Sequence, residues 1–275
     1  MMQWRPEAEA AIKKVPFFVR KRVKARVEEE ARRKGQKVVT LAEVNAAQKR
    51  YISGMASEIR GYQLDTCFGP SGCPNQIQPG NDLLEKIEDV LKKADLLTFL
   101  KSQGIGELKF HHEFRVTLAD CPNACSQPQI KDLGIIGACR PTISEAPCSS
   151  CEACREVCRE DAICLDSNGG PPVVDGIRCV ACGQCLAVCP TGTLMEGAKG
   201  YRVQLGGKLG RHPRLARELP GIFDSSAVLD IVQAAIDLYK ARSRKGQRFG
   251  EILQPSDIDE FSARFRRRTI IPSST

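Results

Sequence analysis

The sequence predicts an α+β fold. Apolar residues recur at helical spacing in the first 52 residues and again from Ser226 to Arg242. By contrast, Phe114 to Ala119 alternates between apolar and polar residues, as a half-buried strand does. The segments Asp132–Gly137 and Tyr201–Leu205 predict two further strands, and a cysteine-rich segment is inserted between them. We therefore expect a helical module over residues 1–52, an α+β domain formed by residues 60–144 and 198–265, and an insert over residues 145–197.

The helical module is predicted to contain three helices. They run from Pro6 to about Lys14, from Phe17 to Lys34 and from Leu41 to about Tyr51. Gly35 is placed to end the second helix, because glycine adopts the left-handed conformation of a C-cap without strain. Thr40 and Glu43 have the spacing of a capping box, which predicts the start of the third helix.

The α+β domain begins with a loop rich in Gly, Pro and Cys over residues 62–80. A helix is expected from Asn81 or Asp82 to about Gln103, and the strand ending at Ala119 then leads to Cys121. Four arginines near the C-terminus are expected to form a solvated tail: Arg264, Arg266, Arg267 and Arg268.

The net charge of +8 is concentrated near the N-terminus. Residues 1–50 hold 14 Lys or Arg and 6 Asp or Glu, and the remainder is balanced. These charges alternate with apolar residues at helical spacing, and Glu28, Glu29 and Glu30 lie among them. We therefore expect a solvated helix face that docks an acidic redox partner, and no nucleic-acid site.

The cellular location of the chain is predicted from its apolar segments and from the spacing of its cysteines. No apolar run reaches the roughly 18 residues that a membrane span requires. No apolar stretch of a secretory signal follows the first charges. The 14 cysteines occur at metal-ligand spacings, which favours a reducing compartment over an extracellular disulfide framework. We expect a cytoplasmic protein with no membrane span.

Eight cysteines form two runs with the spacing C-x2-C-x2-C-x3-C. The runs are Cys148, Cys151, Cys154, Cys158 and Cys179, Cys182, Cys185, Cys189. Three cysteines of a tight loop can bind three corners of a [4Fe–4S] cube, and the fourth thiolate must come from elsewhere. A pair of zinc knuckles is the alternative, but zinc sites need four ligands in closed pairs, so the spacing favours iron–sulfur clusters.

These runs resemble those of two-cluster ferredoxins, in which the fourth cysteine of each run binds the other cluster. The resemblance implies that Cys148, Cys151, Cys154 and Cys189 bind cluster I, and that Cys179, Cys182, Cys185 and Cys158 bind cluster II. Such ferredoxins usually have proline after both fourth cysteines. Here Pro190 follows Cys189 but Arg159 follows Cys158, and we expect the charge of Arg159 to raise the potential of cluster II.

Four more cysteines form a different pattern: Cys67 and Cys73 (C-x5-C), then Cys121 and Cys125 (C-x3-C). Residues 60–265 resemble the cluster-binding half of sirohaem sulfite and nitrite reductases. The resemblance rests on Cys67-Phe68-Gly69-Pro70-Ser71-Gly72-Cys73, on Cys121-Pro122-Asn123-Ala124-Cys125, on the segment 132–137 and on Gly206-Gly207-Lys208. The insert after the second pair is similar to that of the dissimilatory and anaerobic members. The resemblance implies that all four cysteines bind a third [4Fe–4S] cluster and that Cys125 also bridges to the sirohaem iron.

The N-terminal module is similar to the small helical module at the C-terminus of the B subunit of dark-operative protochlorophyllide reductase. The similarity rests on Trp4, Pro6, Val15-Pro16-Phe17-Phe18-Val19-Arg20, Ala31, Gly35 and Val39-Thr40. The cluster and substrate residues of that enzyme lie outside this module, so no activity is carried over.

Two functions follow from these resemblances. In the first, electrons pass from two ferredoxin-type clusters to the third cluster and to sirohaem, as in a sulfite or nitrite reductase. In the second, the chain is a non-catalytic electron-transfer subunit of a larger redox complex and lacks sirohaem. The family has two similar halves and this chain has room for one, so a second subunit or a homo-oligomer is expected to supply the other. No catalytic residue is assigned; cations that could neutralise sirohaem carboxylates or an anion are Arg50, Arg60, Lys208 and Arg211.

Several other residues are set aside. Cys139 and Cys164 fall outside the three sets, and both are expected to be buried thiols. His111, His112 and His212 have no partner at ligand spacing and are expected to be ordinary surface or capping residues.

Overall fold

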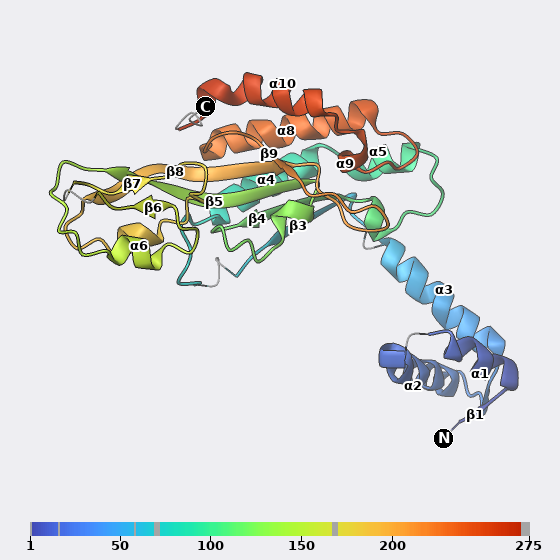
Figure 1. Cartoon of the computed structure of the whole chain (residues 1–275). Helices are drawn as coiled ribbons and strands as arrows, with labels where there is room; N and C mark the ends of the chain where they lie inside the picture. Colours follow the sequence, from blue (N-terminus) through green and yellow to red (C-terminus); the bar gives the residue numbers. More distant parts are fainter. Residues whose placement is uncertain (1, 16, 58, 69–71, 167–169, 271–275) are drawn as a thin grey trace. The chain divides into compact units, whose positions relative to one another are not determined.

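The computed structural model describes residues 2–15, 17–57, 59–68, 72–166 and 170–270 (Figure 1). The chain divides into two compact units: Met1–Ile59 with Glu107–Lys109, and Arg60–Gly106 with Phe110–Thr275. Helices and strands are both present in quantity, so the expected α+β class is confirmed. Within the described ranges, no helix combines the length and the apolar content that crossing a membrane requires.

The first unit contains three helices and a short parallel pair of strands. Its elements are β1 (Gln3–Trp4), α1 (Pro6–Lys13), α2 (Phe17–Arg33), β2 (Val38–Val39) and α3 (Leu41–Ser57). Its small core consists of Ala8, Val27, Ala31, Val39 and Val44. All three helices were predicted, and α3 continues beyond the expected end.

The predicted caps of the first unit are present. The Thr40 backbone N–H donates to Oε2 of Glu43 (2.8 Å), and the Ala42 N–H donates to the Thr40 hydroxyl (3.2 Å). The Thr40 hydroxyl also donates to Oε2 of Glu43 (2.6 Å), and this hydrogen bond, together with the one from the Thr40 N–H, lowers the pKa of Glu43 to about 2. Gly35 ends α2 with φ +72°, a conformation that favours glycine.

The second unit is built on a five-stranded mixed sheet with the strand order β3-β4-β5-β8-β9. The strands are β3 (Tyr62–Thr66), β4 (Phe114–Ala119), β5 (Leu133–Ile143), β8 (Leu194–Leu205) and β9 (Arg217–Glu218). β3, β4 and β5 are parallel, whereas β8 runs antiparallel to both β5 and β9. The carboxyl ends of neighbouring parallel strands lie at the same edge of a sheet. Cys67 and Cys121, which follow β3 and β4, are therefore brought to that edge.

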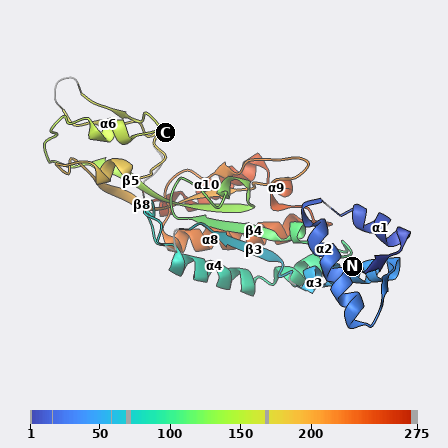
Figure 2. The same cartoon turned by 90° about the horizontal axis from the view of Figure 1, so that it is seen from below.

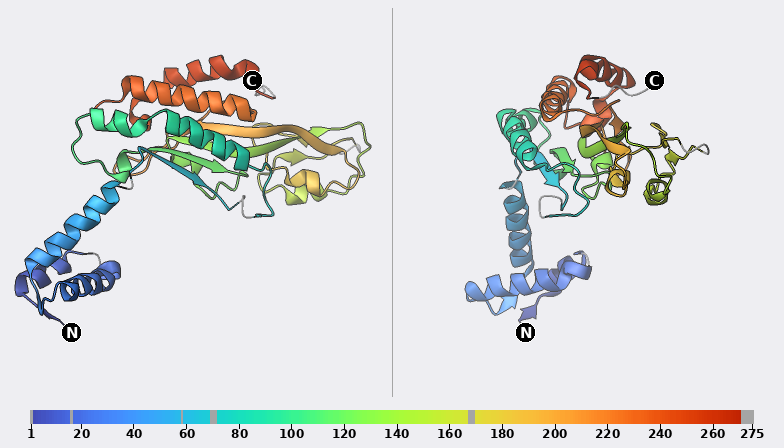
Figure 3. Two further views of the ribbon diagram at one scale, coloured as in Figure 1. Left: turned by 180° about the vertical axis from the view of Figure 1, so that it is seen from behind. Right: turned by 90° about the vertical axis from the view of Figure 1, so that its left-hand side faces the viewer.

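Helices cover one face of this sheet (Figure 3). They are α4 (Asn81–Lys93), α5 (Leu96–Ser102), α8 (Ser225–Arg242), α9 (Phe249–Ile252) and α10 (Pro255–Phe265). Short 3-10 turns occur at Phe110–His112, Pro128–Ile130 and Arg266–Arg268. The core lies between helices and sheet, with Ile87 of α4, Tyr239 of α8 and Phe114 of β4 almost fully buried.

Three predictions for this unit need correction. Tyr62–Thr66, expected to belong to the loop over residues 62–80, form β3 and pair with β4. The single helix expected to about Gln103 is broken at Asp95, which has φ +46° and caps α5 by accepting from the Thr98 N–H (3.3 Å). Arg264, Arg266 and Arg267 are exposed as expected, but the four arginines lie at the end of α10 and in the following 3-10 turn and do not form a tail. Arg268 bonds to Asp230 of α8 and to the Ser226 hydroxyl, because α10 packs beside α8.

The insert lies at the end of a long two-stranded ribbon formed by β5 and β8 (Figure 2). Their pairing extends from Leu133 and Leu205 to Ile143 and Leu194, with an irregularity between Cys139 and Pro141. Both strands are thus longer than expected, and β8 includes residues that were assigned to the insert. Between the ribbon ends lie α6 (Ala153–Val157), β6 (Ile163–Cys164), β7 (Val173–Val174) and α7 (Gln184–Ala187).

Candidate metal centres

The carboxyl ends of two parallel strands bring the first two cysteine pairs to one edge of the sheet. Thr66, the last residue of β3, pairs with Leu118 of β4. The Cys67 N–H donates to the Leu118 carbonyl (3.2 Å), and Cys121 follows β4 after one intervening residue. The loops that carry the two pairs therefore start side by side, although 47 residues separate the pairs in sequence.

A buried aspartate joins these two loops. The Asp120 N–H donates to Sγ of Cys67 (3.3 Å), its carbonyl accepts from the Ile77 N–H (3.0 Å), and its carboxylate accepts from Nε2 of Gln76 (2.8 Å). Burial raises the pKa of Asp120. A Cβ at Gly137 would lie 2.5 Å from the Asp120 carbonyl oxygen, so glycine is needed beside it. No sequence motif singled out Asp120, because its role depends on the packing of distant loops.

The four thiols of this third site (Cys67, Cys73, Cys121 and Cys125) lie within electrostatic reach of one another. Burial raises the pKa of Cys121, and the charges of the other three thiols raise it further. Cys125 is exposed, and its Sγ accepts a hydrogen bond from Nδ2 of Asn123 (3.0 Å). Residues 69–71 of the C-x5-C motif lie outside the described residues.

The two ferredoxin-like runs have the same backbone conformation. The residues on either side of the second cysteine have positive φ in both: Ser150 (52°) and Glu152 (61°), then Ala181 (57°) and Gly183 (69°). A short helix, α6 or α7, begins immediately afterwards. Because a left-handed residue other than glycine costs about 1–2 kcal/mol, the repeated conformation indicates a functional constraint on both loops.

Backbone N–H groups point at the sulfur atoms of these runs. The N–H of Ser150 donates to Sγ of Cys148, that of Ala162 to Sγ of Cys158 and that of Leu194 to Sγ of Cys189, each with an N–S distance of 3.4 Å. Hydrogen bonds of this kind stabilise thiolates and tune the potentials of iron–sulfur clusters. Within the part of the chain that the structure describes, no cysteine forms a disulfide bond. Among the described residues, no three His, Cys, Asp or Glu side chains converge closely enough to hold a single metal ion. Thiols supported by N–H donors fit an iron–sulfur cluster.

The fourth cysteine of the first run lies with the second run. Burial raises the pKa of Cys185 to about 12, and the charges of Cys179, Cys182 and Cys158 add to the increase. These thiols are the set that the ferredoxin resemblance implies for cluster II, and we call them site II. The local loop of Cys158 does not predict this placement; it arises because the two runs pack against each other.

The remaining thiols form site I: Cys148, Cys151, Cys154 and Cys189. Burial raises the pKa of Cys154, and the charges of Cys148 and Cys151 act in the same direction. The loop after Cys189 reaches the start of the first run, because the Thr193 hydroxyl donates to the Pro147 carbonyl (3.1 Å). Burial tends to raise the pKa of Cys189, but hydrogen bonds from Leu194 and Thr191 outweigh it and lower the pKa.

One cavity is lined by ligands of both site II and the third site. Its volume is about 460 Å³. Cysteines of site II form part of its wall, and Cys121, Pro122 and Asn123 of the third site form another part. Arg159 also lines it, next to Cys158, and is exposed. Site II and the third site are therefore neighbours, a relation that no sequence spacing predicted.

The β5–β8 ribbon holds the site II loop. The Cys139 N–H donates to the Ala181 carbonyl (2.8 Å), and Nη1 of Arg202 donates to the Val180 carbonyl (3.0 Å). Arg202 is itself fixed by two 2.7 Å hydrogen bonds to Glu218 of β9. Sequence reasoning missed Arg202, since a charged residue on a strand gives no sign of the loop that it supports.

Two of the cations proposed for anion binding are engaged in ion pairs. Lys208 contacts Glu251 (2.6 Å), and Arg60 lies 3.7 Å from Glu88. Arg211 is exposed. The side chain of Arg50 lies outside the described residues.

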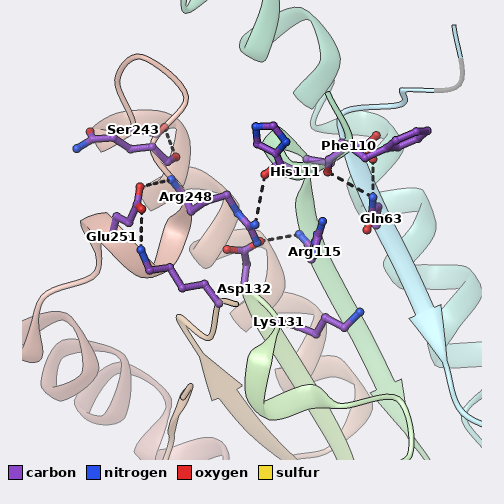
Figure 4. Close-up of polar contacts among 12 residues, drawn as sticks. Gln63, Phe110, His111, Arg115, Lys131, Asp132, Ser243, Arg248 and Glu251 are labelled. Atoms are coloured by element: carbon purple, nitrogen blue, oxygen red, sulfur yellow. Dashed lines mark hydrogen bonds and ion pairs between the residues drawn. The ribbon is translucent and has the colours of Figure 1, made fainter. Parts of the chain in front are cut away.

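Glu251, the partner of Lys208, accepts from the Arg248 N–H (3.0 Å) and belongs to a polar cluster at the amino end of β4 and β5 (Figure 4). At its centre Asp132 is fully buried and accepts from Nη2 of Arg248 (2.5 Å) and from the Arg115 N–H (2.9 Å). Burial raises the pKa of Asp132, and Arg248 opposes the increase. The cluster ties the start of α9 to the sheet at the edge opposite to Cys67 and Cys121.

The structure confirms the prediction for one of the two cysteines outside the three sets and contradicts it for the other. Cys139 is 2% exposed, as expected. Cys164 is exposed, so the prediction of a buried thiol was wrong: Ile163 takes the inward position of β6 and Cys164 points outward. The rings of His111 and His112 lie 4.2 Å apart, and His212 is exposed.

Comparison with known proteins relates each part of the chain to a family. The profile of the nitrite and sulphite reductase 4Fe-4S domain matches residues 63–270, and that of the proto-chlorophyllide reductase 57 kD subunit matches residues 4–48. A coenzyme F420-dependent sulfite reductase of Methanocaldococcus jannaschii is 28% identical over 182 residues, which are 66% of this chain and 27% of that protein. An uncharacterized ferredoxin of the same organism is 47% identical over 49 residues, 17% of this chain and 31% of that protein.

One of the subunits of the anaerobic sulfite reductase of Salmonella typhimurium is 29% identical over 157 residues, 55% of this chain and 45% of that protein. The chain thus spans less than half the length of each of these relatives. The first profile nevertheless covers most of the chain, including all three sets of cysteines. The chain therefore belongs to the nitrite and sulphite reductase 4Fe-4S domain family and is a sulfite-reductase-like iron–sulfur protein.

Proposed function

We propose that this chain carries three [4Fe–4S] clusters and passes electrons from site I through site II to the third site and to a sirohaem at Cys125. The observation that carries the proposal is the cavity shared by site II and the third site, because it makes site II the neighbour from which the third site receives electrons. Bound clusters would supply one-electron transfer, and sirohaem would supply the iron that binds sulfite or nitrite.

The residues of the chain would act mainly by holding these groups. Asp120 joins the loops of Cys67 and Cys121, so it would keep the third site in shape. Cys125 is the exposed thiol of that set and would bridge to the sirohaem iron. The proposed parts are the helical module 1–52, the cluster domain 60–144 with 198–265, and the ferredoxin-like insert 145–197.

The alternative is an electron-transfer subunit that binds the clusters but no sirohaem. It is supported by the pairing of Arg60 with Glu88 and of Lys208 with Glu251, which offsets the charges that sirohaem carboxylates would need. Both functions would include a partner, either a second subunit or another copy of the chain. The basic N-terminal module would dock an acidic redox protein, and the metal-ligand spacing of the cysteines favours a reducing compartment such as the cytoplasm.

An anaerobic preparation reconstituted with iron, sulfide and sirohaem tests the proposal. We expect about 12 cluster irons per chain, one further haem iron, and a visible band that shifts when sulfite is added. Absence of the chromophore, with all cluster irons present, would leave the electron-transfer subunit as the function.

Cys125→Ser should abolish the haem band and lower the iron content by the share of one cluster. Cys164→Ser is the matched control, since Cys164 is also exposed but lies outside the three sets. Equal iron and haem contents in the two variants would contradict the assignment of Cys125.

A further inference from the structure

An arginine of the β5–β8 ribbon lies where the ribbon meets the site II loop. Arg140 sits at the irregularity of β5, between Cys139 and Pro141. Cys139 bonds to the loop through the Ala181 carbonyl, and Pro141 lines the cavity beside the site II cysteines. The backbone on both sides of Arg140 is thus fixed against site II.

The charge of Arg140 is not balanced by a carboxylate. Among the described residues, no Asp or Glu forms an ion pair with it, and its Nε is buried without a hydrogen-bond partner. The other arginine at this loop, Arg202, is neutralised by Glu218. Burial raises the pKa of Cys179, and the backbone hydrogen bond of Ala181 and then the Arg140 charge oppose the increase, so the guanidinium lies within electrostatic reach of this thiol.

A cation near a cluster favours the form that carries the extra electron. The interaction is stronger for a partly buried charge than for an exposed one, because water and salt screen the exposed charge. Arg159, which the sequence singled out for this role, is exposed and is followed by Glu160 and Asp161. Arg140 is less exposed and has no acidic neighbour in sequence.

We propose that Arg140, and not Arg159, sets the reduction potential of the cluster at site II, raising it so that an electron rests beside the third site. The proposal rests on the proposed presence of a [4Fe–4S] cluster at site II. One electron is added to the cluster, and no bond is formed or broken. Arg140 would act on the cluster only through its positive charge and takes no part in proton transfer.

Anaerobic redox titration of the reconstituted full chain, followed by electron paramagnetic resonance, tests the proposal on three variants. Arg140→Gln should lower one of the three cluster potentials, with about a tenfold decrease in the equilibrium constant for reduction, ~59 mV for one electron. Arg140→Lys should restore most of this shift, because it keeps the charge. Arg159→Gln should move the same potential by less than half as much.

The outcomes separate this inference from the proposed function. Fewer than three clusters in the wild-type chain would count against the proposed function. The role of Arg140 would be overturned if all three clusters are present and Arg140→Gln leaves each potential at its wild-type value. It would also be overturned if Arg159→Gln shifts the same potential as much as Arg140→Gln does. If Arg140→Gln loses the site II cluster, Arg140→Met supplies a neutral side chain of similar length. Loss of the cluster in both neutral variants but not in Arg140→Lys would overturn the tuning role and leave a structural one.

Discussion

The two ferredoxin-like runs have the same loop conformation but different surroundings. The loop of the second run is bonded to β5 through Cys139 and to β8 through Arg202, and its thiols line the cavity that reaches the third site. In the first run Cys151 is exposed, and the two carboxylates near it, Glu152 and Glu156, are exposed as well. The difference shows that one local repeat lies in two environments: Cys151 of the first run is exposed, whereas the loop of the second run is bonded to the sheet.

Replacement of the fourth cysteine of each run is the most direct test of whether the two runs share their ligands. Cys158→Ser, although it lies in the first run, should remove the cluster of site II, and Cys189→Ser should remove that of site I. Each variant should lose about four irons. Only Cys158→Ser should remove the potential that responds to Arg140, and titration of both variants measures this. The reverse pattern would show that each run binds its own cluster.

Removal of the strand support should affect only the second run. Arg202→Gln loses the hydrogen bond to Val180 and the pair with Glu218, and a charged hydrogen bond of this kind contributes about 1.5 kcal/mol. The thermal midpoint of the anaerobic holoprotein should fall by ~3–6 °C, and the site II cluster should be lost first. Arg155→Gln is the control: Arg155 is 64% exposed and its ion pair with Glu152 (3.8 Å) is on the surface, so its loss should change the midpoint little. Equal effects of the two variants would argue against a special role of the ribbon.

The equivalent left-handed positions of the two runs give the smallest effect. Gly183→Ala should destabilise the second run by about 1 kcal/mol, because alanine is strained at φ +69° and the new Cβ would lie 3.6 Å from that of Cys139, an ordinary contact. Glu152→Gly, at the matching position, relieves strain but makes the unfolded chain more flexible, so a change within about 0.5 kcal/mol is expected. Thermal midpoints of both variants provide the measurement. A larger loss for Glu152→Gly would mean that its side chain, and not the backbone, supports site I.

Much of the fold was predictable because its signals are local. The helical spacing, the capping box of Thr40 and Glu43 and the alternation of Phe114–Ala119 each predicted an element that the structure contains. The break at Asp95 was missed because the amphipathic pattern continues through it, and only a side-chain cap marks the boundary. The outward position of Cys164 was missed because a two-residue strand has too short a pattern to show which side is buried.

The sequence by itself predicted the chemistry of this protein. Twelve cysteines at metal-ligand spacing predict the donor atoms, and the two runs of equal spacing form loops with the same backbone conformation. Tertiary structure alone decided which thiols and which charges act together. Site II adjoins the third site, and Arg140, which forms no ion pair among the described residues, lies beside site II, because strands far apart in sequence pair in the β5–β8 ribbon. Contacts at such long sequence separation leave no local pattern, since each residue involved is an ordinary choice for its own strand or loop.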